Sequence, residues 1–316
     1  MTDSSLAFVF PGQGSQRTGM LSDAHAHFSC VRDTFAEASD ALGYDLWGLV
    51  SGDDQEALNL TATTQPALLT CSVALWRAWE AGGGAAPAML AGHSLGEFSA
   101  LTCAGSLAFE DAVRLVRLRG EAMQSAVPVG EGAMAAVLGL EDAEIERYCA
   151  EVTAAGTGIV EAVNYNAPGQ VVIAGERAAL DAAATLLKEA GARRVMPLPV
   201  SAPFHTSLMA PAGEQLREAL ADLPLAAPAI PVVHNVNAET ASDPAVIRTL
   251  LVKQLSSPVR WTACVRVMAA EGVRRIAECG PGKVLGGLNR RIDRELESWY
   301  LEAPADLDAL LAAVAA

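Results

Sequence analysis

The sequence predicts an α/β protein: a parallel-sheet body made from both ends of the chain, with a small α+β domain inserted in the middle. Two observations predict this. Short apolar runs that lead into glycine-rich turns and helical stretches occur near both ends of the chain. Between them, the predicted elements follow the order strand, helix, strand, strand, helix, strand over about 70 residues, which is the ferredoxin-like arrangement. The chain has 316 residues and is 51% hydrophobic, enough for a sizeable core.

The first part of the body is expected to begin with a buried strand at residues 6–10 (LAFVF), which runs into the turn PGQGSQRTGM. Helices are predicted over 23–43 and 64–81. A second apolar strand at 88–92 (AMLAG) ends just before Ser94, and the helical stretch EFSALTCAG follows. The chain therefore passes from strand through a tight turn to a helix at this serine.

The middle of the chain predicts the inserted domain. The expected elements are strands at 133–140, 159–165, 170–174 and 194–200, and helices at 141–152 and 176–190. Two prolines in the last strand favour an edge position in the sheet. We assign residues 127–199 to the insert, and 1–126 with 200–316 to the body, with a ligand cleft between them.

After residue 200 the sequence again shows the pattern of strands, tight turns and helices that predicts a parallel sheet. The stretch 230–238 (IPVVHNVNA) is strand-like, and 274–292 is typical of a strand, a tight turn and a helix. These segments are expected to complete the sheet of the body.

Composition excludes several classes of function. The net charge of −15 argues against non-specific binding to nucleic acid, which requires basic surface. The six cysteines are scattered and form no C-x-x-C pair, so we expect neither a metal knuckle nor a disulfide framework. The start of the chain lacks the basic run and long apolar core of a signal peptide, and no clean stretch of 18 apolar residues occurs. We expect a cytoplasmic monomer that does not bind a membrane.

Ser94 lies in a Gly-x-Ser-x-Gly pattern (GHSLG) between a predicted strand and a predicted helix. In this context the glycines allow a sharp turn that exposes the serine hydroxyl, and the following helix start stabilises negative charge there. The pattern predicts a nucleophile. The alternative is an ordinary serine at a helix N-cap.

A serine nucleophile requires a base, for which histidine is the usual residue. We favour His205, which follows a strand end on a loop bounded by proline. His25 and His27 are expected to be solvated, His93 to point away from the serine and pack, and His234 to be a core residue. No Asp or Glu between the serine and His205 lies at an obvious strand end, so either an acid or a backbone carbonyl could orient the imidazole.

An acyl-transfer site also requires two donors for the oxyanion. The backbone N–H of Leu95, directly after the serine, is one candidate. Gln13 in the early turn PGQGSQ is the other. This turn lacks the lysine and spacing of a phosphate loop, so we discount that alternative.

Arg119 is the one charge on an otherwise apolar stripe of the predicted helix 111–126. A guanidinium keeps its proton in a protein, so a buried one requires an anion. A structural carboxylate or a stem that reaches water is one interpretation. The functional interpretation is an arginine that binds a ligand carboxylate through two hydrogen bonds.

Seven collinear motifs between residues 6 and 295 resemble the malonyl-CoA:acyl carrier protein transacylases of bacterial fatty acid synthesis. They are FVFPGQGSQ, TQPALL, GHSLGE, RLRGEAMQ, NAPGQVVIAG, LPVSAPFH and ECGPGKVLGGL. The resemblance implies an α/β-hydrolase-like body with an inserted ferredoxin-like domain. It also implies that Ser94 carries the acyl group, that His205 is its histidine and that Arg119 binds the malonyl carboxylate, with Gln13 and Leu95 at the oxyanion.

The same resemblance suggests three further site residues. Gln254 matches a glutamine whose backbone carbonyl orients the histidine, and Asn164 matches an asparagine that faces the cleft. Phe204 takes a position where an aromatic ring accompanies malonyl and a small residue accompanies methylmalonyl in related polyketide acyltransferases, because the ring fills the space of a branch methyl.

The implied reaction is ping-pong transfer of malonyl from malonyl-CoA to the phosphopantetheine thiol of holo-acyl carrier protein, through a malonyl-serine ester and without metal or cofactor. Three alternatives remain: a trans-acting malonyl transferase of a polyketide synthase, a serine esterase or thioesterase, and a non-catalytic binding protein. Because both proteins are acidic, docking of the carrier requires a local basic cluster. The candidates are Lys283 with Arg290 and Arg291, and Lys188 with Arg193 and Arg194.

Overall fold

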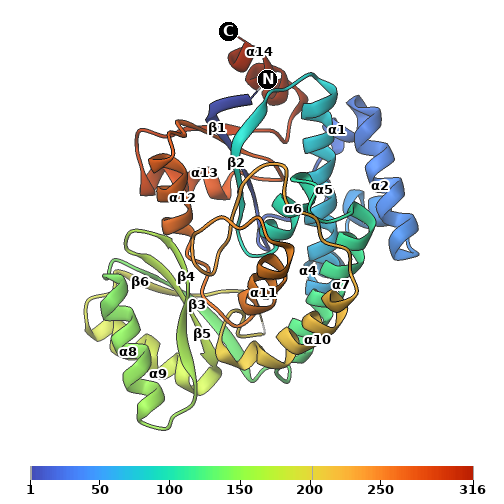
Figure 1. Ribbon diagram of the computed structural model, residues 1–316. Coiled ribbons are helices and arrows are strands. Elements are labelled where there is room, and N and C mark those ends of the chain that lie inside the picture. The colour runs from blue at the N-terminus through green and yellow to red at the C-terminus, as the bar shows by residue number, and fades with distance from the viewer. Residues whose placement is uncertain (1, 201, 316) are drawn as a thin grey trace.

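The computed structural model describes residues 2–200 and 202–315, which form two sheets with helices around them (Figure 1). The larger sheet is parallel throughout and has the strand order β7-β2-β1-β8-β9. Its strands are β1 (Thr2–Phe10), β2 (Ala86–Gly92), β7 (Val232–Val233), β8 (Arg275–Glu278) and β9 (Glu297–Tyr300). Both ends of the chain contribute to this sheet, as predicted.

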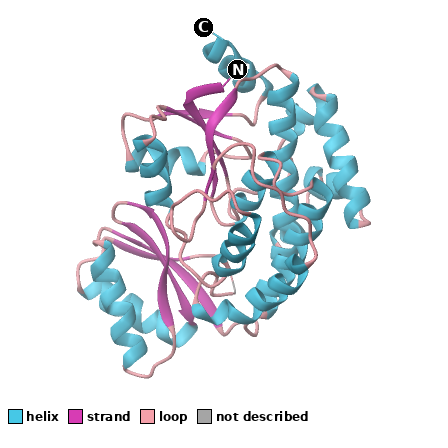
Figure 2. Ribbon diagram, viewed as in Figure 1, coloured by secondary structure: helices cyan, strands magenta, loops and turns pink. Residues whose placement is uncertain are grey.

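The central strand β1 accounts for the layered core. Leu6, Phe8 and Phe10 face one hydrophobic cluster, Ala7 and Val9 face another, and all five are fully buried. A parallel strand with helices on both faces must be apolar at every position, which is why LAFVF has no polar alternation. Figure 2 shows helices on both sides of this sheet.

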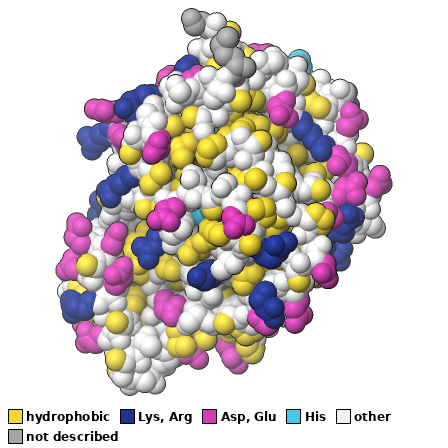
Figure 3. Space-filling model, in the orientation of Figure 1, with side chains coloured by type: hydrophobic (Ala, Val, Ile, Leu, Met, Phe, Trp, Pro, Cys, Tyr) yellow, Lys and Arg dark blue, Asp and Glu magenta, His cyan; other side chains and the backbone are white. Residues whose placement is uncertain are grey.

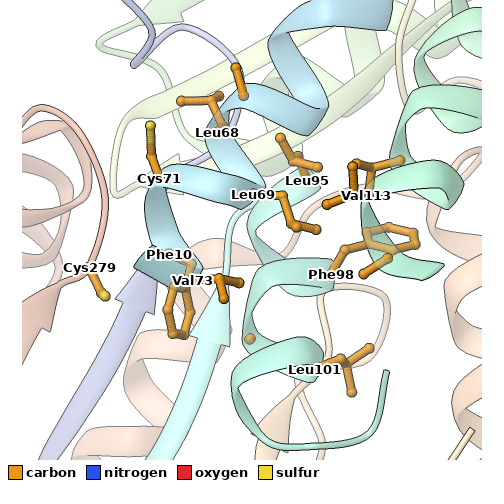
Figure 4. Packing of buried hydrophobic residues seen from close by; sticks show 14 of the residues in the cluster. Phe10, Leu68, Leu69, Cys71, Val73, Leu95, Phe98, Leu101, Val113 and Cys279 are labelled. Carbon is orange, nitrogen blue, oxygen red and sulfur yellow. The ribbon is translucent and has the colours of Figure 1, made fainter. Parts of the chain in front are cut away.

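Most of the helices pack on the first of these two clusters. They are α1 (Ser22–His27), α2 (Ser29–Leu42), α3 (Leu46–Ser51), α4 (Gln55–Asn59), α5 (Thr61–Ala81), α6 (Leu95–Cys103), α7 (Phe109–Ser125), α10 (Ala210–Ala221), α11 (Pro244–Gln254) and α14 (Pro304–Ala315). Leucines of α5 meet Leu95 and Phe98 of α6 and Val113 of α7 (Figure 4). The opposite cluster is covered by α12 (Trp261–Ala270) and α13 (Val284–Ile292). Helix α6, which follows Ser94, is therefore anchored by apolar packing.

The smaller sheet is antiparallel and has the order β4-β5-β3-β6. Its elements follow the chain order β3 (Gly132–Leu138), α8 (Asp142–Ala154), β4 (Val160–Ala167), β5 (Gln170–Glu176), α9 (Arg177–Glu189) and β6 (Arg194–Pro197). This is the predicted ferredoxin-like arrangement. Strand β6, which ends at Pro197, takes the edge position. The division into domains at 127 and 199 remains a prediction.

Direct hydrogen bonds join the smaller sheet to the body. Val259 accepts from the N–H of Tyr165 at 3.0 Å and donates its own N–H to Val163 at 2.8 Å. The carboxylate of Glu161 accepts from the backbone and hydroxyl of Ser207 at 2.8 and 2.7 Å. Strand β4 is thereby fixed against the loops of the body that flank the serine turn.

Two predicted elements differ from the observed ones. Residues 230–238 form a strand only at Val232–Val233, because the residues that follow bond to the serine turn and to their own loop instead of a neighbouring strand. The predicted helix 23–43 is divided into α1 and α2 by Phe28, whose backbone is extended. The sequence analysis predicted no element at the further positions that are occupied by α3, α4, α10, α11, α12, β9 and α14.

Candidate active site

Ser94 lies at a strained turn between β2 and α6, with φ 52° and ψ −107°. Neither of the two flanking glycines could carry a side chain. A Cβ on Gly92 would lie 1.8 Å from the backbone of Gly96, and a Cβ on Gly96 would lie 2.0 Å from the carbonyl oxygen of Phe10. Asn235 fixes the turn from outside. Its side chain accepts from the N–H of Ser94 at 2.8 Å and donates to the carbonyl of Gly92 at 2.7 Å.

His205 lies beside the serine, and its two ring nitrogens have partners of different kinds. Nδ1 is 2.8 Å from the backbone carbonyl of Gln254, and Nε2 is 2.8 Å from Ser94 Oγ. A carbonyl only accepts, so Nδ1 carries the hydrogen and Nε2 is left to accept the serine proton. The group that orients the imidazole, left open by the sequence, is a backbone carbonyl.

The environment keeps the imidazole of His205 neutral. Burial, followed by the positive charge of Arg119, lowers the pKa of His205 to about 3, although the hydrogen bond to Gln254 acts in the opposite direction. A neutral imidazole is the form that can accept a proton. The side chain is only 3% exposed.

Arg119 is buried on the apolar stripe of α7, as predicted, with 1% exposure. Its Nη1 donates to Gln65 Oε1 at 2.8 Å, and its Nη2 donates to Gln254 Oε1 at 2.8 Å and to Ser94 Oγ at 3.1 Å. All three acceptors are neutral. Burial lowers the pKa of Arg119 to about 9 and the charge of Glu97 opposes that change, so the guanidinium is still charged at pH 7. None of these partners of Arg119 is therefore a carboxylate.

These residues line one cavity of about 160 Å³. Of the predicted site residues, the cavity wall includes Gln13, Ser94, Leu95, Arg119, Asn164, Phe204 and His205. Gln254 lies behind it and contacts the serine, the histidine and the arginine. Strands β3, β4 and β5 of the smaller sheet supply Met134, Asn164 and Val172, so the cavity lies between the two sheets. In Figure 3, histidine atoms reach the surface near the middle of one face, among hydrophobic side chains.

The two predicted oxyanion donors lie on this cavity. Leu95 is the first residue of α6, so its N–H has no acceptor within the helix. Gln13 lies in the turn that follows β1, next to the end of β2. Phe204 and Asn164 line the same cavity and are only 8% and 6% exposed.

Two histidines differ from their predicted environments. His93 does not point away from the site: it lines the same cavity, and its Nε2 donates to Asn166 Oδ1 at 2.8 Å. The turn at Ser94 is sharp enough that neighbouring side chains reach the cleft together. His25 is not fully solvated but half-buried, stacked on Trp47 with ring centroids 3.6 Å apart. His234 is a core residue, as predicted.

Sequence reasoning missed three buried polar residues around the site: Gln65, Glu97 and Asn235. Gln65 and Glu97 lie within the quoted motifs TQPALL and GHSLGE, and each is a polar residue in an apolar helix. That signal was available. Asn235 lies in a stretch with the apolar pattern of a strand, and nothing local distinguished it.

The described part of the chain contains no helix long and apolar enough to cross a membrane. All six cysteines are unpaired. Within residues 2–200 and 202–315, no group of three or more His, Cys, Asp or Glu side chains is arranged to hold a metal ion.

A serine hydroxyl against a neutral imidazole, at a strand–turn–helix elbow, defines the class of enzymes that transfer acyl groups through serine. Comparison with known proteins agrees. The model of the acyl transferase domain family matches residues 7–288, and the chain belongs to this family.

Relatives match over nearly the whole chain. The malonyl CoA-acyl carrier protein transacylase of Escherichia coli K12 is 55% identical over 305 residues, which cover 96% of this chain and 98% of that protein. The crystal structure of an acyl carrier protein S-malonyltransferase from Vibrio cholerae has a TM-score of 0.95 at 54% identity and covers 97% of this chain and 99% of that one. A malonyl-transacylase solved in complex with a type II polyketide acyl-carrier protein has a TM-score of 0.96 at 50% identity, with 98% and 99% covered.

Proposed function

We propose that this protein transfers the malonyl group from malonyl-CoA to the phosphopantetheine thiol of acyl carrier protein in fatty acid synthesis. One observation carries the choice of acyl group: Arg119 is buried and charged, and within the described part of the chain it bonds only to neutral oxygens, one of which is Ser94 Oγ at 3.1 Å. A buried cation in this state favours a ligand that brings its own carboxylate. The names and identities of the relatives support the same substrate.

In the first half-reaction, Ser94 Oγ attacks the thioester carbonyl of malonyl-CoA while its proton passes to His205 Nε2. The backbone N–H groups of Gln13 and Leu95 stabilise the oxyanion. The C–S bond then breaks, and the CoA sulfur leaves with the proton from His205. A malonyl ester remains on Ser94.

The second half-reaction reverses these steps with a different thiol. The carrier thiol gives its proton to His205 and attacks the ester carbonyl, and Ser94 leaves with that proton. Both steps balance in atoms and electrons without a redox change. We therefore expect no redox cofactor to take part, and because the serine, the histidine and the backbone donors account for each step, we expect no metal either.

The cavity wall determines which acyl groups fit. Phe204 is buried directly before His205 and lines the cavity, and we expect its ring to take the space that a branch methyl would require. We expect malonyl to be accepted over methylmalonyl for this reason. Asn164 lies on the same wall, on strand β4, as a polar contact for the ligand.

The test is reconstitution with purified malonyl-CoA and holo-acyl carrier protein, with release of CoA and formation of malonyl-carrier measured together. We expect the two to rise in equal amounts and both to be abolished in Ser94→Ala. Release of CoA without malonyl-carrier would indicate a thioesterase. Absence of CoA release would indicate a binding protein.

A polyketide carrier is a second candidate acceptor, because one relative at 50% identity was solved with such a carrier. Parallel assays with carriers of the two pathways, compared by kcat/KM, distinguish the two roles. A fatty-acid enzyme prefers the fatty-acid carrier. A marked preference for the polyketide carrier would reassign the role.

We expect the carrier to dock through one of the two basic clusters, whose six side chains are all exposed. Arg194 is the first residue of β6, Arg193 directly precedes it, and Lys188 lies at the end of α9. The continuation of β6 supplies Leu198 and Val200 to the cavity wall. Charge reversal in that cluster should raise KM for the carrier but not for malonyl-CoA. An unchanged KM would exclude the cluster. A cytoplasmic location and a monomeric state remain predictions.

A further inference from the structure

Glu97 is a fully buried carboxylate in the first turn of α6, three residues after Ser94. Its two oxygens accept from three donors. Oε1 accepts from His234 Nδ1 at 2.7 Å, and Oε2 accepts from the N–H of Asn235 at 3.0 Å and from Gln254 Nε2 at 2.8 Å. A buried charge is stable only with such partners. The question is what the charge does there, since it does not line the cavity.

Gln254 links Glu97 to His205, to Arg119 and to the backbone of Ser94. Its backbone carbonyl accepts from His205 Nδ1 at 2.8 Å, and its side-chain Oε1 accepts from Arg119 Nη2 at 2.8 Å. Its Nε2 donates to the carbonyl of Ser94 at 3.0 Å as well as to Glu97. A rotation of this one amide would therefore disturb the arginine and the serine turn together.

A side-chain amide has an oxygen end and a nitrogen end of almost the same shape, so packing alone does not determine its orientation. A carboxylate accepts and never donates, so only the nitrogen end can face Glu97. The oxygen end must then face Arg119. The flipped amide would place NH₂ against a guanidinium and oxygen against a carboxylate, and both contacts would be repulsive.

We propose that Glu97 is a positioning residue that fixes the orientation of the Gln254 amide, so that Arg119 is held toward the cavity. Glu97 also balances the charge of Arg119, although the side chain of Gln254 lies between the two charged groups. This inference rests on the proposed function. It extends that function because Glu97, which does not touch the substrate, would help to select acyl groups that carry a free carboxylate.

The placement of the charge follows from what the arginine must do. A carboxylate in direct contact with Arg119 would occupy the donors that the substrate carboxylate requires. With Glu97 one amide away, Arg119 keeps Gln65, Gln254 and Ser94 as neutral partners, while its Nε is buried and has no partner among the described residues. The charge of Glu97 still opposes the effect of burial on the pKa of Arg119.

The experiment compares single-turnover acylation of Ser94 by malonyl-CoA and by acetyl-CoA, which lacks the second carboxylate. In Glu97→Ala the malonyl-to-acetyl rate ratio is expected to fall about tenfold, the size of an ordinary coupling within one hydrogen-bond network. Glu97→Gln retains an acceptor for Gln254, so it should recover part of the ratio. This conservative variant keeps the test decisive if the alanine variant does not fold.

Glu278 provides the matched control. It is also a buried glutamate, 1% exposed, and its carboxylate accepts from the backbone of Leu285 and Gly286, away from the cavity. Glu278→Gln should lower stability without changing the malonyl-to-acetyl ratio. If it changes the ratio as much as the Glu97 variants do, the effect is general loosening and the proposal is wrong.

A double substitution separates this proposal from the proposed function. In an Arg119→Ala background, Glu97→Ala should no longer change the ratio, because the residue through which it acts is absent. An unchanged ratio in the single Glu97 variants would overturn the positioning role and leave malonyl transfer intact. A wild-type protein that does not react with malonyl-CoA would instead overturn the proposed function.

Discussion

The hydroxyl of Ser94 lies between an acceptor and a donor. His205 Nε2 accepts its hydrogen at 2.8 Å, and Arg119 Nη2 donates to its oxygen at 3.1 Å. The arginine therefore contacts the nucleophile before any ligand is bound. Because a guanidinium presents its donors in a fixed planar fork, its position relative to Ser94 also fixes where a bound carboxylate lies relative to the reacting oxygen.

At this scale, substitution of Arg119 by alanine tests the choice of acyl group. The rate of malonyl transfer relative to acetyl transfer should fall about 10- to 100-fold, the usual value of hydrogen bonds to a charged group. Parallel kcat/KM measurements with the two acyl-CoA substrates give the ratio. Arg117→Ala, at an exposed position of the same helix that pairs with Glu121, is the control and should leave the ratio unchanged. Equal losses with both substrates would contradict the assignment.

The sequence alone could predict Ser94, His205 and Arg119, because each has a local signal: an elbow motif, a loop at a strand end, and a charge on an apolar stripe. It could not predict what they bond to. Asn235 meets Ser94 across 141 positions of the chain, and Gln254 meets Arg119 across 135. Periodicity indicates that a polar side chain is buried, but it does not identify the hydrogen-bond partner that stabilises the side chain there. His93 was placed wrongly for the same reason.

At the scale of elements, the catalytic turn depends on how closely α6 approaches β1. Gly96 lies against the backbone of Phe10, at the end of the central strand, and Gly92 lies against Gly96. The flanking helix is fixed by Leu95 and Phe98 in the core (Figure 4). The elbow is thus a contact between backbones, and a methyl group has no room there.

Gly96→Ala is expected to lower the free energy of unfolding by about 1–3 kcal/mol and to reduce acylation sharply, because the added Cβ must move α6 or β1. Urea unfolding and single-turnover acylation measure the two effects. Gly287→Ala is the matched control: a Cβ added to this helical glycine of α13 would meet no atom within 4 Å, so alanine should stabilise by about 0.5–1 kcal/mol. If Gly96→Ala behaves like Gly287→Ala, the close contact is not a constraint.

Elements with strong patterns could be predicted from the sequence. The five apolar residues of β1 and the alternation of helix and strand in the smaller sheet gave the right types and order. The predicted length of the edge strand β7 was too great, because an apolar run does not show where the backbone leaves the sheet. Helices α3 and α4 were missed because they span only six and five residues, too short for a periodic signal. Shortness does not explain the longer helices α10, α11, α12 and α14, which were also not predicted.

At the scale of the whole molecule, a buried neutral histidine makes stability depend on pH. The native pKa of His205 is about 3, because of burial and then Arg119, whereas an unfolded chain protonates histidine near 6.5. Below about pH 6.5 the unfolded state gains a proton that the native state does not. Stability is therefore complete above that pH and decreases as the pH falls toward 3.

Urea unfolding at pH 7.5 and pH 5.5 measures this loss. The wild-type protein should lose about 1.4 kcal/mol more than His205→Gln between the two values, since one histidine accounts for that difference. For each protein we compare its free energy of unfolding at the two pH values. Any loss of stability that the substitution causes at both pH values therefore cancels. Equal losses in both proteins would show that His205 is accessible to protons in the native state.

The fold class could be predicted at this scale because similar patterns recur at both ends of the chain, although β1 and β8, which pair directly, are more than 260 positions apart. The width of the cleft could not be predicted. It depends on contacts such as those of Val259 with Val163 and Tyr165. Val163 and Tyr165 lie in a predicted strand, but Val259 lies in no predicted element, and nothing in the sequence indicates that the two segments meet.

The most direct measurement is peptide mass spectrometry of the protein after brief incubation with malonyl-CoA and no carrier. We expect a malonyl adduct on the peptide that contains Ser94, absent from Ser94→Ala and removed when holo-acyl carrier protein is added. An adduct on a different peptide, or an adduct at Ser94 that the carrier does not remove, would contradict transfer through this serine.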